Sequence, residues 1–372
     1  MMSYWIEKLQ VTNFRNLLPD IVTFSPGINC ILGENGNGKT NLLEAIHVLT
    51  LRKSFRKNTS FPQYLGFDGE QPEIIFSSTF TSYEKERFSY SVKLLPSSGQ
   101  YFLDGKPVKK KPDFKLVFIN PFDNYNFHTT ASFRRQWFDQ HLSQLDREYK
   151  ISLKQYHNRL KFRNTLLTKK PSQYAQQIAA IDPDIAEQSV ILTQKRIQFL
   201  EDLYPFCHQT FKDIFSEEHD LELKLQTRVG GMNSDQILRM LNERWDKDDN
   251  AGHTTYGVHK DDYELLFDGL NAYEFCSLGQ QKMSYLSLLF AYISLFGYKY
   301  KSFPIVLIDD VSGELDRFRW RRLIDYLKRS QFQVLITTAN ENFKEELEKI
   351  SGANRVYVDS GSFTQTLNKT IE

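Results

Sequence analysis

The chain has 372 residues, of which 40% are hydrophobic and 25% are charged. This composition excludes a disordered chain and leaves room for one large domain or two to three smaller ones. The formal net charge is only +1, so a nucleic-acid partner would require a local basic patch rather than an overall positive charge.

Cysteine usage and hydropathy predict a cytoplasmic protein without a membrane partner. Cys30, Cys207 and Cys276 are far apart and form no CxxC pair, which argues against disulfides and a zinc site. The opening residues MMSYWIEKLQ lack the apolar core of a signal peptide. No stretch approaches the ~18 apolar residues that a membrane span needs.

The first third of the chain has the pattern of short strands around one helix. We expect strands near residues 6–11, 21–24 and 27–32, a helix over 41–51, and further strands between 73 and 119. Asp104-Gly105 lies between two of these expected strands and predicts a hairpin turn.

The middle of the chain has a helical composition. Residues 126–250 are rich in Gln, Lys and Leu and poor in Gly, and we expect helix breaks at Pro171, Pro183 and Pro205. Gly230-Gly231 predicts a turn. No heptad repeat is long enough for a coiled-coil arm.

A residue pattern typical of strands returns near residues 254–266, before a second predicted turn at Asp268-Gly269. We then expect a helix at 279–296, a strand at 304–308, a basic helix at 317–329 and a strand at 332–337. The order predicts an α/β lobe built from both chain ends, residues 1–125 and 251–372, with an inserted helical lobe at 126–250.

A phosphate-binding loop follows the third expected strand. Residues 33–40, GENGNGKT, fit GxxxxGK[ST] at every fixed position. Glycines let successive N–H groups surround phosphate oxygens, and the following helix directs its positive end at the same anion. We expect Lys39 to reach the β- and γ-phosphates of ATP and Thr40 to ligate Mg²⁺. The expected nucleotide-binding residues here are Gly33, Glu34, Asn35, Gly36, Asn37, Gly38, Lys39, Thr40 and Asn41.

Two carboxylates follow a strand that is expected to be buried. The run PIVLI ends in Asp309-Asp310, and ligands bind at the carboxyl ends of parallel strands. Asp309 is therefore the expected second magnesium ligand, and Asp310 the expected catalytic group that polarises the attacking water. The alternative is a plain strand-to-turn junction.

The segment Ser277-Leu278-Gly279-Gln280 precedes this strand. Taken alone, it is most simply a helix N-cap, and such a helix start also binds anions. Phosphate loop, Ser-x-Gly-Gln segment, acidic strand and a Ser-x-x-Leu-Asp turn, in this order, resemble an ABC-type ATPase. The resemblance implies that Ser277, Gly279 and Gln280 of one copy bind the ATP held by a second copy.

Within that class the chain resembles the RecF family over nearly its whole length. The matching segments are LQVTNFRN (9–16), SPGIN (25–29), GENGNGKTNLLEAI (33–46), SFR (54–56), TYGVHKDDYE (255–264), SLGQQ (277–281) and LIDDVSGELD (307–316). The resemblance implies a two-lobed ABC-type head and an ATPase that forms an ATP-dependent homodimer. Because Asp310 is one methylene shorter than the Glu common at this place in ABC-type ATPases, and no His follows the last strand, we expect slow hydrolysis with ATP acting as a switch. It also implies binding to gapped or junction DNA, roles in recombinational repair, replication restart and the SOS response, and RecR-like and RecO-like partners. No zinc-finger, RRM or helix-turn-helix signature indicates base reading, so we expect this DNA binding to be structure-directed.

Some positions depart from the family pattern. Pro121-Phe122-Asp123 replaces the usual Pro-Glu-Asp, Lys260 stands where Arg is usual, and Leu278 and Ser312-Gly313 are uncommon. The alternatives are an SMC-like or other ABC-class switch, a P-loop kinase, and a scaffold with an inactive nucleotide site. A kinase would not need the second anion site, and an SMC head would carry long arms.

Three basic clusters are candidate DNA surfaces, since phosphate contacts need no sequence reading. Their core residues are Arg159, Lys161 and Arg163; Lys106, Lys109, Lys110, Lys111 and Lys115; and Arg52, Lys53, Arg56 and Lys57. A solvated helix face or lysine hairpin is the alternative for each. His259 is expected either as a nucleotide or interface ligand or as a structural partner of Asp261 or Asp262, and Trp137, Trp245 and Trp320 as core or interface residues.

Overall fold

The structure, a computed structural model, describes residues 4–56, 58–66, 72–82, 84–215, 218–310, 315–338 and 340–366. It divides into two compact units. Unit 1 contains residues 1–123, 213–215 and 293–372, and unit 2 contains residues 124–212 and 216–292. Within the described ranges, no helix combines the length and apolar character that a membrane crossing requires.

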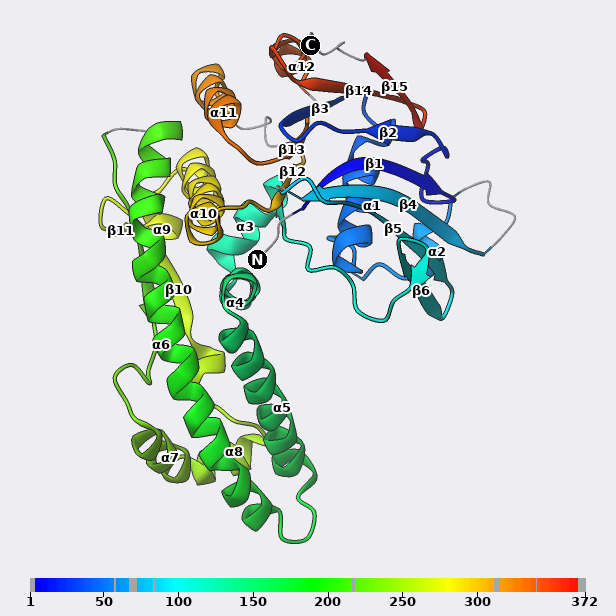
Figure 1. Cartoon of the computed structure of the whole chain (residues 1–372). Coiled ribbons are helices and arrows are strands. Elements are labelled where there is room, and N and C mark those ends of the chain that lie inside the picture. The colour runs from blue at the N-terminus through cyan, green and yellow to red at the C-terminus, as the bar shows by residue number, and fades with distance from the viewer. Residues whose placement is uncertain are drawn as a thin grey trace. The chain divides into compact units, whose positions relative to one another are not determined.

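Unit 1 contains an antiparallel sheet with strand order β2-β1-β4-β5-β6-β7 (Figure 1). Its strands are β1 (Tyr4–Thr12), β2 (Ile21–Thr23), β4 (Ile74–Ser82), β5 (Arg87–Leu95), β6 (Ser98–Leu103) and β7 (Lys106–Pro107). The predicted hairpin at Asp104-Gly105 is confirmed, because both residues have positive φ, 48° and 74°, as the two central residues of a type I′ turn require.

The second sheet of unit 1 has the order β15-β14-β3-β13-β12-β8, and all its pairings except β14 with β15 are parallel. Its strands are β3 (Ile28–Leu32), β8 (Leu116–Ile119), β12 (Ile305–Ile308), β13 (Val334–Thr337), β14 (Asn354–Asp359) and β15 (Ser362–Thr366). β12 and β13 are buried at every position, which explains their unbroken apolar runs.

One core joins both sheets around helix α1 (Lys39–Leu51). Leu42, Ile46 and Leu49 of α1 are fully buried in the same cluster as residues of both sheets. The other helices of this unit are α2 (Phe61–Tyr64), α11 (Arg317–Arg329) and α12 (Glu341–Glu348). Trp320 of α11 is buried and its ring stacks on that of Phe343, so the expected core role of this tryptophan is confirmed.

Unit 2 is mainly helical. Its elements include α4 (Ala131–Leu145), α5 (Arg147–Lys169), α7 (Ser234–Glu243), α8 (Trp245–Ala251), α9 (Ala272–Phe275), the short helix η1 (Val258–Lys260), and a sheet of β9 (Leu221–Gln226), β10 (Asp262–Phe267) and β11 (Leu270–Asn271). Three further helices continue into residues of unit 1: α3 (Pro121–Thr129), α6 (Tyr174–Ile214) and α10 (Leu278–Tyr300). Asp268 and Gly269 have φ values of 51° and 79° between β10 and β11, which confirms the second predicted turn.

Two expectations about the middle of the chain differ from the structure. Helix breaks at Pro183 and Pro205 were wrong, because α6 continues through both prolines. A proline inside a helix removes one hydrogen bond and its ring crowds the carbonyl four residues earlier, but buried residues of this long helix pack on either side of both prolines. Unit 2 also continues to Tyr292 instead of ending at residue 250, since β10 pairs with β9 and packs on α4 and α9.

Candidate active site

The parallel strands of unit 1 bring the predicted motifs to one edge of a sheet. β3, β13 and β12 are adjacent and parallel, so the residues that follow their carboxyl ends lie together. The phosphate loop (residues 33–40) follows β3, Thr337 ends β13, and Asp309 follows β12. Segments that are some 300 residues apart in the sequence therefore meet at this edge.

The phosphate loop needs glycine at two positions for different reasons. Gly33 has φ of 151°, and a Cβ there would lie 2.2 Å from the carbonyl oxygen of Val358. Gly38 caps α1 with φ of 114°, where a side chain would be strained and would meet Asn16. Lys39 Nζ donates to the carbonyl oxygens of Gly33 and Glu34, at 2.6 and 2.9 Å.

Lys39 is a cation poised over a pocket. Its side chain is buried, and burial lowers its pKa, opposed by the nearby carboxylates of Asp310 and Asp309. A partly desolvated ammonium beside a helix N-terminus binds an anion more strongly than an exposed one. The residue therefore has the position and charge that phosphate binding requires.

Asp309 receives two hydroxyl groups. Thr40 and Thr337 each donate a side-chain hydrogen bond to Asp309 Oδ1, at 3.0 and 2.8 Å. Burial raises the pKa of Asp309, partly offset by these two donors. The Thr337 hydroxyl also accepts the N–H of Asp310 at 3.1 Å, so it links the two carboxylate residues.

The donor set fits Mg²⁺. This ion prefers oxygen ligands and is commonly held by one or two carboxylates together with substrate phosphates and water. Thr40 and Asp309 supply a hydroxyl and a carboxylate whose oxygens are 3.0 Å apart. No group of three or more His, Cys, Asp or Glu side chains suited to a metal occurs among the described residues, and a site completed by phosphate oxygens needs none.

The sequence did not predict the role of Arg56 in this pocket. Its guanidinium donates to Asn41 Oδ1 at 2.7 Å and lies 3.4 Å from Glu44 Oε2. Glu44 is fully buried on α1 and also receives two hydrogen bonds from Arg15, at 3.1 and 2.9 Å. Glu44 thus joins the N-terminal segment to the segment after α1. In the sequence, the signal for this contact is that Glu44 is the single acidic residue of the otherwise largely apolar helix α1.

The cavity at this edge has a volume of 220 Å³. It is lined by Asn35, Gly36, Gly38, Lys39, Thr40, Asn41, Arg56, Asp309, Asp310 and Thr337. Gly33, Glu34 and Asn37 were also predicted to bind nucleotide but are not in this lining. The Asn37 side chain instead donates to Val358 O and Asp359 Oδ1, both at 3.3 Å.

The Ser-x-Gly-Gln segment lies in unit 2, at the start of α10. Ser277 caps this helix: its hydroxyl accepts the Gln280 N–H at 3.3 Å, and the Gln280 side chain accepts the Ser277 N–H at 2.9 Å. Leu278 beside it is 70% exposed. Ser277, Gly279 and Gln280 are absent from the phosphate-pocket lining. Ser312, Gly313 and Glu314 of the later turn lie outside the described residues.

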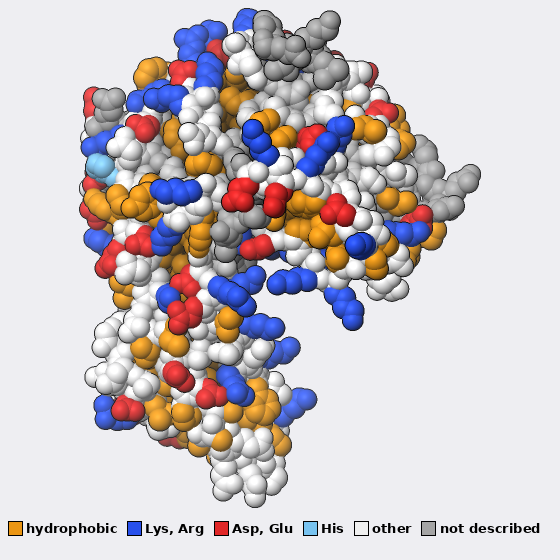
Figure 2. Space-filling model, viewed as in Figure 1, with side chains coloured by type: hydrophobic (Ala, Val, Ile, Leu, Met, Phe, Trp, Pro, Cys, Tyr) orange, Lys and Arg blue, Asp and Glu red, His pale blue; other side chains and the backbone are white. Residues whose placement is uncertain are grey.

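The residues of the three basic clusters have different surroundings in the structure. In the hairpin cluster Lys115 is buried and pairs with Asp113, and Lys111 donates to Thr50 O. In the cluster after α1, Arg56 lines the phosphate pocket, and Lys57 lies outside the described residues. Figure 2 shows Lys and Arg side chains gathered along the edge of unit 2 that α5 forms.

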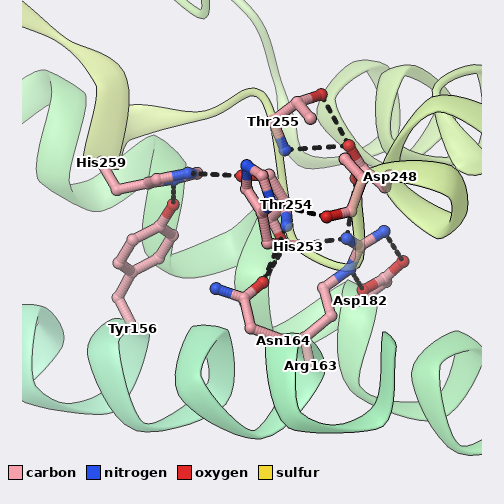
Figure 3. A network of polar contacts seen from close by, with 10 residues as sticks. Tyr156, Arg163, Asn164, Asp182, Asp248, His253, Thr254, Thr255 and His259 are labelled. Carbon is pink, nitrogen blue, oxygen red and sulfur yellow. Dashed lines mark hydrogen bonds and ion pairs between the residues drawn. The ribbon is translucent and has the colours of Figure 1, made fainter. Parts of the chain in front are cut away.

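Arg163 was wrongly grouped with the DNA-binding candidates. It is fully buried and forms ion pairs of 2.8 Å with both Asp182 and Asp248 (Figure 3). It also donates to the Thr254 hydroxyl. Its position at the inward face of α5 places it between two buried carboxylates, where one arginine satisfies both.

His259 is a structural residue, but its predicted partners were wrong. Its Nε2 donates to Thr254 O at 3.1 Å and its Nδ1 accepts the Tyr156 hydroxyl at 2.8 Å (Figure 3). Burial lowers the pKa of His259 to about 4, which agrees with a neutral ring in this arrangement. Asp261 and Asp262 pair instead with Arg196 and Arg134.

Comparison with known proteins places these features in a family. The RecF/RecN/SMC N-terminal domain family matches residues 5–360. The DNA replication and repair protein RecF of Clostridium novyi (strain NT) is 28% identical over 341 residues, covering 90% of this chain and 92% of that protein. RecF of Parabacteroides distasonis is 29% identical over 347 residues, covering 92% of this chain and 93% of that protein.

Solved structures show a similar fold. The structure of RecF-ATP, the recombination mediator protein of the RecFOR pathway, superposes with a TM-score of 0.84 at 23% identity, covering 98% of both chains. The Smc head domain of Pyrococcus furiosus gives a TM-score of 0.60 at 16% identity, covering 98% of this chain and 96% of the other.

Proposed function

The chain belongs to the RecF/RecN/SMC N-terminal domain family, and on this basis we propose that it is a RecF-type ATPase of DNA replication and repair. It acts as a recombination mediator: it binds gapped or junction DNA, dimerises with ATP, and aids the loading of a recombinase. RecR-like and RecO-like proteins are its partners, and the cytoplasm is its location.

One observation carries the ATPase proposal. Lys39, Thr40, Asp309 and Asp310 come from two motifs far apart in the sequence and line one 220 Å³ cavity at the carboxyl edge of a parallel sheet. A phosphate loop alone would indicate nucleotide binding. The acidic strand end supplies what a hydrolase needs in addition: oxygen ligands for Mg²⁺ and a carboxylate for the attacking water.

Each residue has a proposed task. The loop N–H groups and Lys39 hold the β- and γ-phosphates, and Asn41 and Arg56 border the same cavity. Thr40 and Asp309 hold Mg²⁺, which neutralises developing charge on the phosphates when bound. Asp310 orients the attacking water and accepts its proton. The Asp310 side chain is one methylene shorter than the Glu that is common at this place in ABC-type ATPases, so it reaches the attacking water less well. Hydrolysis is therefore slow, and ATP serves as a timed switch.

The dimer completes the site in this proposal. The start of α10, with Ser277, Gly279 and Gln280, presents the positive end of the helix dipole to the γ-phosphate held by a second copy. Unit 1 holds the phosphate loop and the acidic strand end, and unit 2 holds the Ser-x-Gly-Gln segment. Two ATP molecules are then enclosed between two copies, and hydrolysis releases them.

We expect Lys39→Ala to lower ATP affinity by about 10- to 100-fold and to abolish ATP-dependent dimers. The substitution removes a buried cation whose charge-assisted bonds to phosphate are each worth about 1.5–3 kcal/mol. Titration calorimetry measures the affinity, and sedimentation with and without ATP and duplex DNA measures assembly. Lys349→Ala removes an equal charge at an exposed position and should leave both unchanged. Equal ATP affinity in Lys39→Ala and the parent protein contradicts the assignment of the phosphate loop.

We expect Ser277→Arg to retain ATP binding by the monomer and to lose ATP-dependent dimers. The large cation would occupy the helix start that is proposed to meet the partner's γ-phosphate, while the residues that line the phosphate cavity are unchanged. Light scattering with ATP measures the dimer. Ser277→Thr retains a hydroxyl cap and should dimerise normally. Dimers of normal stability in Ser277→Arg would show that this segment lies outside the interface.

A further inference from the structure

Helix α5 carries its basic residues on one outward face. At 100° per residue, Arg147, Lys150, Lys154 and Lys161 fall within an arc of about 60° around the helix. All four are exposed. Glu148, the single acidic residue of α5, lies outside this arc and pairs with Lys195. We call these four cations the α5 stripe.

The α5 stripe lacks ion-pair partners among the described residues, as do Lys106, Lys109 and Lys110 of the hairpin cluster, whereas Arg56 and Lys115 are paired. Arg159, on the flank of the same helix, pairs with Asp184 at 3.0 Å. Holding four like charges unpaired on one face is unfavourable in isolation, and this arrangement fits a polyanion that would neutralise them.

The surroundings of the stripe suit a phosphate backbone. A surface depression along the second half of α5 is lined by His157, Asn158, Lys161, Thr165 and Thr168, among others. Amide, hydroxyl and imidazole groups are common hydrogen-bond partners of phosphate oxygens. From Arg147 to Lys161 the stripe spans about 21 Å, the axial length of about six phosphates of one DNA strand.

The inward face of α5 is fixed by the polar network of Figure 3. Arg163 pairs with two carboxylates, and Asn164 Oδ1 accepts both the N–H and the hydroxyl of Thr254, each at 2.8 Å. Tyr156, one position before His157, donates to His259. These contacts fix the rotation of the helix about its axis, so the stripe is held outward before any ligand binds.

A membrane surface fits this face less well. A helix that lies on a membrane needs one continuous apolar face for insertion. The apolar face of α5, with Tyr149, Tyr156, Leu166 and Leu167, is buried within unit 2. The exposed apolar residues of the helix, Ile151 and Phe162, are 11 positions apart and form no continuous surface.

We propose that the α5 stripe is a docking surface for the sugar–phosphate backbone of duplex DNA. Arg147, Lys150, Lys154 and Lys161 contact phosphates, and no base is read. The inference rests on the proposed function, because it locates DNA binding on a RecF-type protein. Of the cluster predicted from the sequence, only Lys161 remains a DNA contact in this proposal. Arg159 is paired with Asp184 and Arg163 is buried.

The test compares two triple variants of the full chain with equal charge changes. Lys150→Gln/Lys154→Gln/Lys161→Gln removes three stripe cations. Arg159→Gln/Lys224→Gln/Lys247→Gln removes three exposed cations of unit 2 that lie off the stripe. Binding to a fluorescent duplex with ATP is measured from 50 to 200 mM salt, alongside ATP turnover without DNA and binding to phosphatidylserine vesicles.

The stripe variant should bind duplex DNA at least about tenfold more weakly, and its log–log salt slope should fall by about three units, one for each lost phosphate contact. The off-stripe variant should keep the parent slope, and both should retain basal ATP turnover. A parent-like salt slope in the stripe variant would overturn the assignment of DNA binding to the α5 stripe but would leave the proposed DNA-binding function intact. Loss of vesicle binding with DNA binding intact would overturn it in favour of a membrane surface. A parent protein that binds no duplex would overturn the proposed DNA function as well.

Discussion

Replacing Asp310 with Asn should reduce ATP turnover by about 10²–10⁴-fold, the usual cost of losing a general base. ATP binding and dimerisation should be retained, because Lys39, Thr40 and Asp309 are unchanged. Asn is suited to this position, since Asp310 has φ of 42° and Asn is among the residues that best tolerate this left-handed conformation. The backbone N–H of residue 310 can still donate to Thr337.

The dimer and any DNA that it encloses should then outlive those of the parent protein. Phosphate release and dimer lifetime would be measured on one preparation. Asp309→Asn is the matched control, because removing the magnesium ligand should weaken nucleotide binding as well as turnover. Turnover within about a factor of two of the parent would remove Asp310 as the base. Loss of dimers in Asp310→Asn would instead assign this residue to magnesium binding or to the interface.

Replacing Arg163 with Met should destabilise unit 2 by about 3–5 kcal/mol, the cost of removing one partner from a buried ion pair. Asp182 and Asp248 have side chains only 3% and 1% exposed, and both would lose their counter-ion. Met retains much of the volume, so the effect reports on charge more than on packing. Arg159→Met is the matched control: its pair with Asp184 is 49% exposed on both sides and should be worth less than about 1 kcal/mol.

Urea unfolding followed by circular dichroism measures both variants. The pH dependence gives a second readout of the Arg163→Met effect. Burial already raises the pKa of Asp182, and loss of Arg163 would raise it further. Because a raised folded-state pKa favours proton uptake on folding, the deficit of Arg163→Met should shrink as the pH falls from 7 toward 5. Equal stability of the two variants would mean that the buried network adds nothing to the fold.

Local sequence rules predicted the motifs and most of the elements that carry them. The phosphate loop, the basic helix at 317–329 and both Asp-Gly turns depend on residues that are neighbours in the chain. Glycines at positive φ and a helical apolar period need no tertiary partner in order to be recognised. The order of the motifs along the chain also indicated the family.

The meeting of distant segments is what the tertiary structure decided. Parallel pairing of β3, β13 and β12 placed Thr337 beside Asp309, and the sequence gives no sign of which strands will be neighbours. Arg56 and Arg163 have the same charge and lie in similar basic runs, yet one lines the phosphate pocket and the other is buried between two aspartates. A buried carboxylate is stable only beside a cation, and Glu44 pairs with Arg56 while Asp182 and Asp248 pair with Arg163. Only the folded chain shows where these carboxylates lie.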